Sequence, residues 1–388
     1  MALLKSRRKR LWQFSSLMMN NTDLGNISVY VHIPFCKSKC NYCAFYSLAG
    51  CDDKTKQSYT NALVKQITAL KTQRTVGSIY FGGGTPPVLG TERIAGILSN
   101  IKDRFLLSDN CEITIEVNPD TVNADDFVLL KKAGFNRLSL GLQTSEKKEL
   151  ALLGRTYDLK KFSEAIYSAK AAGFFNISTD IIFGLPLQTV CSLRQTLKDA
   201  LSFDLPHISV YSLSIEEKTP FFYNKDNLNL PDDKTEDEMY YIVCDILCSH
   251  GYKHYEISSF AEDGMESKHN LHYWNCGEYI GFGAAAHSYF YRKRFSGIAD
   301  IDEYIKRSND FFNPTDYKSQ PFLTEEEKRK ERIMLGLRTS KGIYADQKIL
   351  GKSKKYIDNG YAGLKNGFLF LTDKGYRISN TIITDLIW

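Results

Sequence analysis

Over its first 215 residues the chain alternates short apolar runs, rich in β-branched and aromatic residues, with longer stretches of helical periodicity. The apolar runs predict strands at 27–33, 78–81, 112–117, 137–142, 177–185 and 207–213. The periodic stretches predict helices at 58–73, 91–104, 124–133, 159–172 and 190–202. Strands separated by helices indicate repeated βαβ units and an α/β fold with a parallel sheet. This pattern fits an open doubly wound sheet as well as a barrel or part of a barrel.

Beyond residue 215 the alternation weakens. The elements expected there are a helix at 234–249, a strand near 255–260, a polar, aromatic-rich loop through 264–298, helices at 302–311 and 324–338, and a small hairpin within 368–379. We therefore predict three parts: a basic tail at 1–26, a core domain at 27–299 and a compact accessory domain at 300–388. The accessory domain is expected to be α+β and winged-helix-like.

Composition places the chain among ordinary soluble globular proteins, with 43% hydrophobic and 24% charged residues. Basic residues at positions 5, 7, 8, 9 and 10 account for the whole formal net charge of +5. We expect this tail to lack a fixed fold, although an arginine-rich, acid-free start also fits an organellar transit peptide. The neutral remainder offers no electrostatic footprint for nucleic acid. No stretch is apolar enough to span a bilayer, and the nine scattered cysteines fit a reducing compartment, so a cytoplasmic location is expected.

Three of the cysteines, Cys36, Cys40 and Cys43, lie within eight residues directly after the first predicted strand. Thiolates prefer zinc or iron–sulfur clusters. A structural zinc ion needs four ligands, which Cys51 or His32 could complete. A four-iron cluster held by three cysteines leaves one iron free to bind a small chelating molecule. The residue pattern favours the cluster over zinc, and both over three unrelated buried thiols.

The segment CKSKCNYC (36–43) is a CxxxCxxC motif and resembles the radical-SAM superfamily. That resemblance implies a [4Fe-4S] cluster on Cys36, Cys40 and Cys43, whose open iron binds the amino and carboxylate groups of S-adenosylmethionine (SAM). It also implies reductive cleavage of SAM to a 5′-deoxyadenosyl radical, and a partial (β/α)6 barrel.

Polar residues at the ends of consecutive predicted strands fit a pocket for SAM. The glycines of FGGGTPP (81–87) allow close approach of the backbone, although such a run can equally be a tight turn. A lone acid at a strand end is usually a helix cap, but several such ends face one cavity in a parallel barrel. YVHIPFC, GGGTP, IEVNP, GLQ, GR and TDIIFGLP also resemble, in order, the anaerobic coproporphyrinogen III oxidase-like group. That resemblance implies SAM contacts at Tyr30, Tyr42, Gly83, Gly84, Thr85, Glu116, Gln143, Arg155 and Asp180.

Two features distinguish the branches of this group. The oxidases have a motif that resembles CxxxCxxCxC. Here Phe45 occupies the position of its last cysteine, two residues after Cys43. Residues 269–274, HNLHYW, match the HNxxYW motif of the heme chaperone branch (HemW type). From the residues alone, a hydrogen-bonded loop histidine is the favoured interpretation. The resemblance instead implies heme binding, with His269 as the candidate axial ligand and His287 as a second candidate.

The favoured hypothesis is a heme chaperone that transfers heme to an acceptor protein and carries a [4Fe-4S] cluster and SAM. The alternative is an oxygen-independent coproporphyrinogen III oxidase, a radical-SAM decarboxylase, and a third is a zinc-stabilised binding module. The sequence does not decide whether SAM is cleaved, so enzyme activity is left open. Expected partners are heme, a heme-acceptor protein and an electron donor, with membrane contact only if the acceptor is itself membrane-bound.

Overall fold

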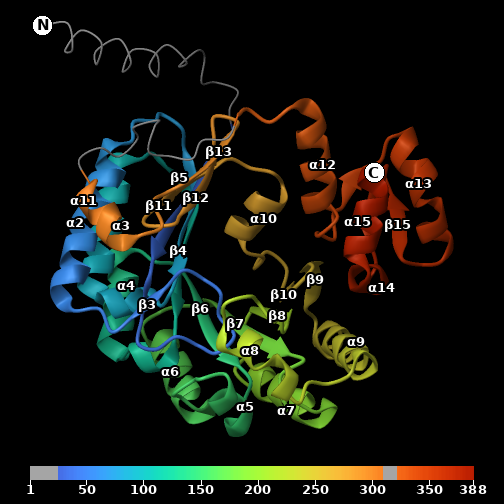
Figure 1. Ribbon diagram of the computed structural model, residues 1–388, viewed down its shortest axis with the longest axis horizontal. Helices are drawn as coiled ribbons and strands as arrows, with labels where there is room; N and C mark the ends of the chain where they lie inside the picture. Colours follow the sequence, from blue (N-terminus) through green and yellow to red (C-terminus); the bar gives the residue numbers. More distant parts are fainter. Residues whose placement is uncertain (1–24, 309–320) are drawn as a thin grey trace, which may run out of the picture.

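A computed structural model describes residues 25–308 and 321–388, and its centre is one curved eleven-stranded sheet (Figure 1). The strands follow the order β13-β12-β11-β1-β4-β5-β6-β7-β8-β10-β9. The middle six are parallel: β1 (Ile27–Ile33), β4 (Val76–Gly83), β5 (Leu107–Val117), β6 (Arg137–Gln143), β7 (Asn176–Phe183) and β8 (His207–Ser212). The two end strands do not pair with each other, so the six-stranded parallel core is a partial barrel, as expected.

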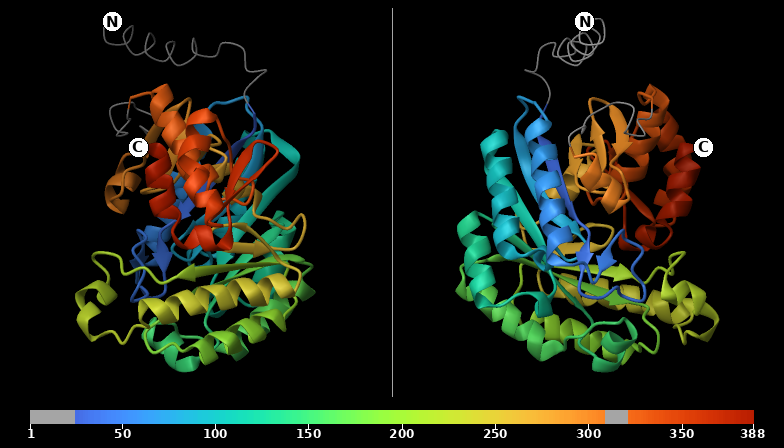
Figure 2. Two further views of the ribbon diagram at one scale, coloured as in Figure 1. Left: turned by 90° about the vertical axis from the view of Figure 1, so that its right-hand side faces the viewer. Right: turned by 60° about the vertical axis from the view of Figure 1, so that its left-hand side comes forward.

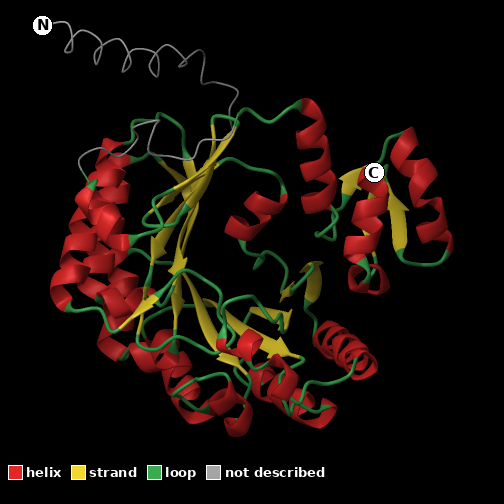
Figure 3. Cartoon of the chain, in the orientation of Figure 1, coloured by secondary structure: helices red, strands yellow, loops and turns green. Residues whose placement is uncertain are grey.

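Helices cover the outer face of the sheet (Figures 2 and 3). They are α2 (Asp53–Ala69), α3 (Thr91–Arg104), α4 (Ala124–Ala133), α5 (Lys147–Leu152), α6 (Leu159–Ala171), α7 (Val190–Leu201) and α9 (Asp233–Ser249). Local signals set their ends, as α4 shows. Asn123 and Asp126 form a capping box at its start, and Gly134 takes the left-handed conformation at its end.

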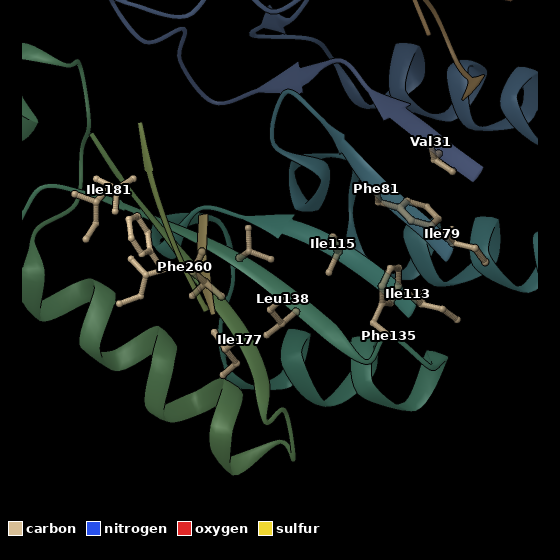
Figure 4. Packing of buried hydrophobic residues seen from close by; sticks show 14 of the residues in the cluster. Val31, Ile79, Phe81, Ile113, Ile115, Phe135, Leu138, Ile177, Ile181 and Phe260 are labelled. Carbon is tan, nitrogen blue, oxygen red and sulfur yellow. The ribbon is translucent and has the colours of Figure 1, made fainter. Parts of the chain in front are cut away.

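Each parallel strand has an apolar face toward the helices and a polar face toward the barrel interior. Val31, Ile79, Ile115 and Leu138 pack on the helix side with the rest of the main core (Figure 4). Strand residues alternate in direction, so Tyr30, Tyr80, Glu116, Ser139 and Asp180 belong to the opposite face. Parallel strands are usually apolar on both faces. The polar interior therefore marks the concave side as the place for a polar ligand.

The expected loop at 264–298 is wrong. This segment contains the helix α10 (Lys268–Trp274) and the strands β11 (Tyr279–Phe282), β12 (His287–Phe290) and β13 (Lys293–Ser296). Strand β11 pairs in parallel with β1 and extends the sheet. The expected strand at 255–260 is instead two short strands, β9 (Lys253–Glu256) and β10 (Ser259–Ala261). Strand β10 pairs with β8 on one side and with β9 on the other.

Helix α11 (Ile301–Lys306) packs on α2 of the barrel, where the rings of Tyr304 and Tyr59 lie 5.2 Å apart. The C-terminal part contains α12 (Glu325–Gly336), β14 (Ile343–Tyr344), α13 (Gln347–Asp358), β15 (Ala362–Lys365), β16 (Phe368–Leu371), α14 (Asp373–Arg377) and α15 (Ser379–Ile387). Its hairpin is β15–β16, so residues after 371 form helices and not the second strand that the sequence suggested.

The domain boundary near residue 300 stays a prediction. Residues 1–24 of the expected tail at 1–26, and the end of the expected helix at 302–311, lie outside the described residues. Among the described helices, none combines the length and the apolar character that a membrane crossing requires.

Candidate cluster and SAM site

The three clustered cysteines lie on a loop that leaves β1 and is closed at its base. The short strands β2 (Phe35–Cys36) and β3 (Leu48–Ala49) pair with each other and hold the two ends of the loop together. The glycine segment after β4 fixes its start, because the Gly84 and Thr85 amides donate to the Ile33 and Phe35 carbonyls at 2.9 and 2.8 Å. A Cβ atom on Gly84 would lie 2.7 Å from the Phe35 carbonyl oxygen and 2.9 Å from the Cys36 sulfur. Only glycine fits here, so GGGT forms the floor of the cysteine loop.

The donor set fits an iron–sulfur cluster better than a single zinc ion. Three thiolates leave one ligand position open. A structural zinc ion would need a fourth protein ligand, whereas a four-iron cluster on three cysteines keeps that position for a small chelating molecule. His32 is occupied elsewhere, since its Nε2 donates to the Tyr46 carbonyl and its Nδ1 accepts from the Tyr30 hydroxyl.

Burial raises the pKa of the Cys40 thiol, and the positive charge of Arg155 lowers it in part. The same arginine connects the cysteine loop to two strand ends. It donates to the Tyr42 hydroxyl at 2.7 Å and to the Asn118 side chain, directly after β5, at 3.0 Å. Asn118 in turn donates to the Thr85 hydroxyl after β4 at 3.0 Å. The sequence pointed to Tyr42, Thr85 and Arg155, and the structure brings them into one network.

A pocket opens beside this network, lined by Cys40, Asn118, Asp120, Arg155 and Tyr157 among others. Among the described side chains, the Arg155 Nε atom is buried and has no hydrogen-bond partner. A buried cationic donor without a partner, next to three thiols, suits a carboxylate such as that of SAM.

Acidic groups lie on the inner face, one on β5 and one on β7. Glu116 accepts from the Tyr80 hydroxyl at 2.8 Å, and burial raises its pKa to about 7 while that hydrogen bond lowers it. Asp180 accepts from Ser139 at 3.0 Å, and burial raises its pKa as well. Burial therefore favours the neutral form of both acids, and such groups suit hydroxyl groups or a cationic centre.

The remaining predicted SAM contacts differ in position. Gln143 is buried at the end of β6 in the left-handed conformation, with φ of 67°. Gly83 is also left-handed, and a Cβ there would meet the His32 ring at 2.6 Å. Tyr30 lies deeper, near the middle of β1, and donates to His32. Its described contacts are within the strand layer, so SAM contact at Tyr30 stays a prediction.

The sequence reasoning missed Asn118, Tyr80 and Tyr157. Asn118 lies inside the quoted IEVNP segment and Tyr80 inside the SIYF strand, so the alternation of β4 could have revealed Tyr80 as inward-facing. Tyr157 donates to the Gly141 carbonyl at 2.7 Å. Nothing local in the sequence indicates that contact.

The HNLHYW segment is helix α10, which lies against β4 inside the curve of the sheet (Figure 1). Glu112 on β5 accepts from the Lys268 and His269 amides at 3.1 and 3.0 Å, so it holds the first turn of this helix. The side chain of His269 is buried, with Nδ1 at 2.9 Å from the Ser78 hydroxyl and Nε2 at 2.8 Å from the Tyr273 hydroxyl. Burial lowers its pKa to about 3.

His269 is therefore a neutral imidazole with both ring nitrogens engaged. The residues alone favoured such a hydrogen-bonded histidine, but they placed it in a loop, and the structure places it on helix α10. His287 is exposed on β12, and Phe45 is 72% exposed on the cysteine loop. The structure thus separates the two candidate heme ligands by exposure.

Comparison with known proteins agrees with this geometry. Residues 30–200 match the model of the radical SAM superfamily. The chain is 41% identical over 375 residues to "Heme chaperone HemW" of Bacillus subtilis, covering 92% of this chain and 97% of that protein. It is 36% identical over 370 residues to the protein of the same name from Buchnera aphidicola subsp. Schizaphis graminum, covering 92% and 97%. The solved structure of coproporphyrinogen III oxidase (HemN) from Escherichia coli superposes with a TM-score of 0.81 at 22% identity, covering 94% of this chain and 90% of that one.

Proposed function

Because the chain belongs to the radical-SAM superfamily, and within it to the HemW family, we propose that it binds heme and passes it to an acceptor protein. The observation that carries this proposal is the near-complete match to relatives named as heme chaperones, at up to 41% identity. The loop around Phe45 supports this proposal. Phe45 is exposed and stands at the position where the CxxxCxxCxC motif of the oxidases has its fourth cysteine.

We further propose that Cys36, Cys40 and Cys43 hold a [4Fe-4S] cluster and that the surrounding polar network holds SAM. When bound, the cluster supplies an electron and an open iron position for a chelating ligand. Arg155 would hold the SAM carboxylate, while Thr85 and Asn118 keep that guanidinium oriented. Glu116 and Asp180 would face the ribose or the sulfonium.

For heme, His269 remains the proposed axial ligand, but ligation has a structural cost. Its Nε2 would exchange the Tyr273 hydroxyl for iron, and α10 would have to move, because the imidazole is 1% exposed. His287 needs no such rearrangement.

Anaerobic heme titration of the reconstituted protein tests both assignments. With His269 as ligand, His269→Ala shifts the heme absorbance maximum and weakens binding, and His287→Ala leaves both unchanged. Tyr273→Phe, which frees Nε2, should then strengthen heme binding. The opposite pattern, with loss only in His287→Ala, would reject His269, and the absence of heme binding in the unaltered chain would reject the chaperone proposal.

The fold similarity to HemN keeps one second candidate, an oxygen-independent coproporphyrinogen III oxidase. Anaerobic incubation with SAM, a reductant and coproporphyrinogen III distinguishes the two functions. The chaperone proposal predicts no protoporphyrinogen, and product formation at enzymatic rates would establish the oxidase. Heme transfer also requires an acceptor protein, and reduction of the cluster requires an electron donor.

A further inference from the structure

A second group of metal-binding side chains lies far from the cysteine loop, between the barrel and the C-terminal part. The thiol of Cys244, the imidazole of His254 and the carboxylate of Asp373 come from α9, β9 and α14, which lie side by side in Figure 1. One potential ligand atom from each residue lies within 4.8 Å of the other two. Among the described residues, this is the one such set of three or more histidine, cysteine and acidic side chains.

We propose that Cys244, His254 and Asp373, completed by Cys248, form a zinc site that fastens α14 to the barrel. Cys248 lies one helical turn beyond Cys244, and residues four apart share a helix face. Cys248 is not one of the three residues whose ligand atoms lie within 4.8 Å of one another, so its exposed side chain has to turn toward them to complete the shell. Two thiolates, one imidazole and one carboxylate match the mixed ligands of four-coordinate zinc, and the thiolates disfavour magnesium and calcium.

The imidazole is already oriented for a metal ion. Its ring stacks on Phe260 at 4.2 Å with an interplanar angle of 15°, so it cannot turn freely. Nδ1 lies 2.7 Å from an Asp373 carboxylate oxygen, and Nε2 lies 3.5 Å from the Ile257 carbonyl. A zinc ion would replace the proton shared by Nδ1 and the carboxylate, while Nε2–H points to the carbonyl, as is common for ligating histidines.

A zinc ion can reach this site from solvent, and the protons that it displaces can leave to solvent. Cys244 is buried, but the Asp373 side chain is 47% exposed, so an ion can reach the site from solvent. Each cysteine that binds loses its thiol proton to solvent, and no electron transfer is involved. Without zinc, α14 is still held to α9 by Arg377 with Glu236 and Asp237, so the group does not require a metal to explain the fold.

The experiment uses the full chain with its cluster reconstituted, so that the cysteine loop cannot take up zinc. The protein is equilibrated with Zn2+ and dialysed against a competing chelator, and zinc, iron and sulfide per chain are measured. We expect one retained zinc per chain. His254→Gln, Asp373→Asn and Cys248→Ser should each weaken zinc retention by more than about tenfold at unchanged iron content.

Cys191→Ser is the matched control, because Cys191 is an exposed thiol on α7 and should leave zinc retention unchanged. Asp373→Asn changes an accessible side chain and keeps its shape, so it tests the site even if replacement of the buried Cys244 prevents folding. Zinc K-edge absorption should show a mixed shell of two sulfurs with nitrogen and oxygen. The proposal is overturned if the unaltered chain retains no zinc, if the variants retain as much as the control, or if the zinc shell contains three sulfurs, which would place the ion on the cysteine loop.

Discussion

The buried imidazole of His269 should make the stability of the protein depend on pH, and a single substitution isolates its share. The pKa of His269 is about 3 in the folded protein, because burial disfavours the charged ring. In the unfolded chain it returns to about 6.5. Between these values the unfolded state binds more protons, so this contribution to stability is complete above pH 6.5 and is lost as the pH falls toward 3.

The magnitude follows from these two pKa values. Between pH 7 and pH 5, protonation of His269 in the unfolded chain lowers the free energy of unfolding by about 2 kcal/mol. Other buried histidines act in the same direction, since burial also lowers the pKa of His207 and of His32. The quantity to compare is therefore the difference in the free energy of unfolding between the unaltered chain and His269→Asn at each pH.

Urea unfolding of the reconstituted protein under anaerobic conditions measures this difference. At pH 7 the variant should be less stable, and at pH 5 the gap should narrow by about 2 kcal/mol. Tyr273→Phe keeps the imidazole and should keep most of the pH dependence. A gap of equal size at both pH values would show that His269 is not a buried neutral imidazole, and the described position of α10 would then be wrong.

Three further substitutions test how the site is held together. Arg155→Lys should raise the Kd for SAM about tenfold or more in equilibrium dialysis. The lysine ammonium cannot keep the hydrogen bonds to Tyr42 and Asn118 and also donate to the SAM carboxylate, and a hydrogen bond to a charged group is worth roughly 1.5–3 kcal/mol. An unchanged Kd would show that Arg155 does not bind SAM. Gly84→Ala should reduce iron and sulfide content by displacing the cysteine loop, whereas Gly96→Ala, with open space at its Cβ, should keep the full content; equal loading would contradict the steric argument. Glu112→Gln should lower the free energy of unfolding by about 2 kcal/mol, because the amide can accept only one of the two bonds at the start of α10. The exposed Glu164→Gln serves as its control and should change that free energy by less than about 0.5 kcal/mol, and matching results for the two would contradict the role of Glu112.

The sequence predicted the elements whose formation depends on neighbouring residues. The six parallel strands follow from apolar β-branched runs, and their helices from periodicity and caps such as Asn123 and Gly134. The cysteine loop follows from three thiols spaced over eight residues. The glycines after β4 predict a place where the backbone approaches another group closely. The sequence does not show that this group is the Cys36 segment of the cysteine loop.

The parts that were missed depend on contacts between distant residues. Helix α10 has only seven residues, and Glu112, which holds its start, lies 157 residues before His269. Strands β11 to β13 have four residues each, too short for alternation to be recognised, and they form because β1 offers an open edge. The side chains of His254 and Asp373 are 119 residues apart, so no spacing rule joins them.

The central claim is that three cysteines hold a cluster whose remaining iron binds SAM. Electron–nuclear double resonance of the reduced, reconstituted protein tests it directly, with SAM labelled by 17O in its carboxylate and 15N in its amino group. With SAM on the fourth iron, both labels should show hyperfine coupling to the cluster, and Cys40→Ser should lose both couplings together with the cluster signal. A cluster signal that is identical with and without labelled SAM would show that the fourth iron takes another ligand, and would contradict SAM binding at the cluster.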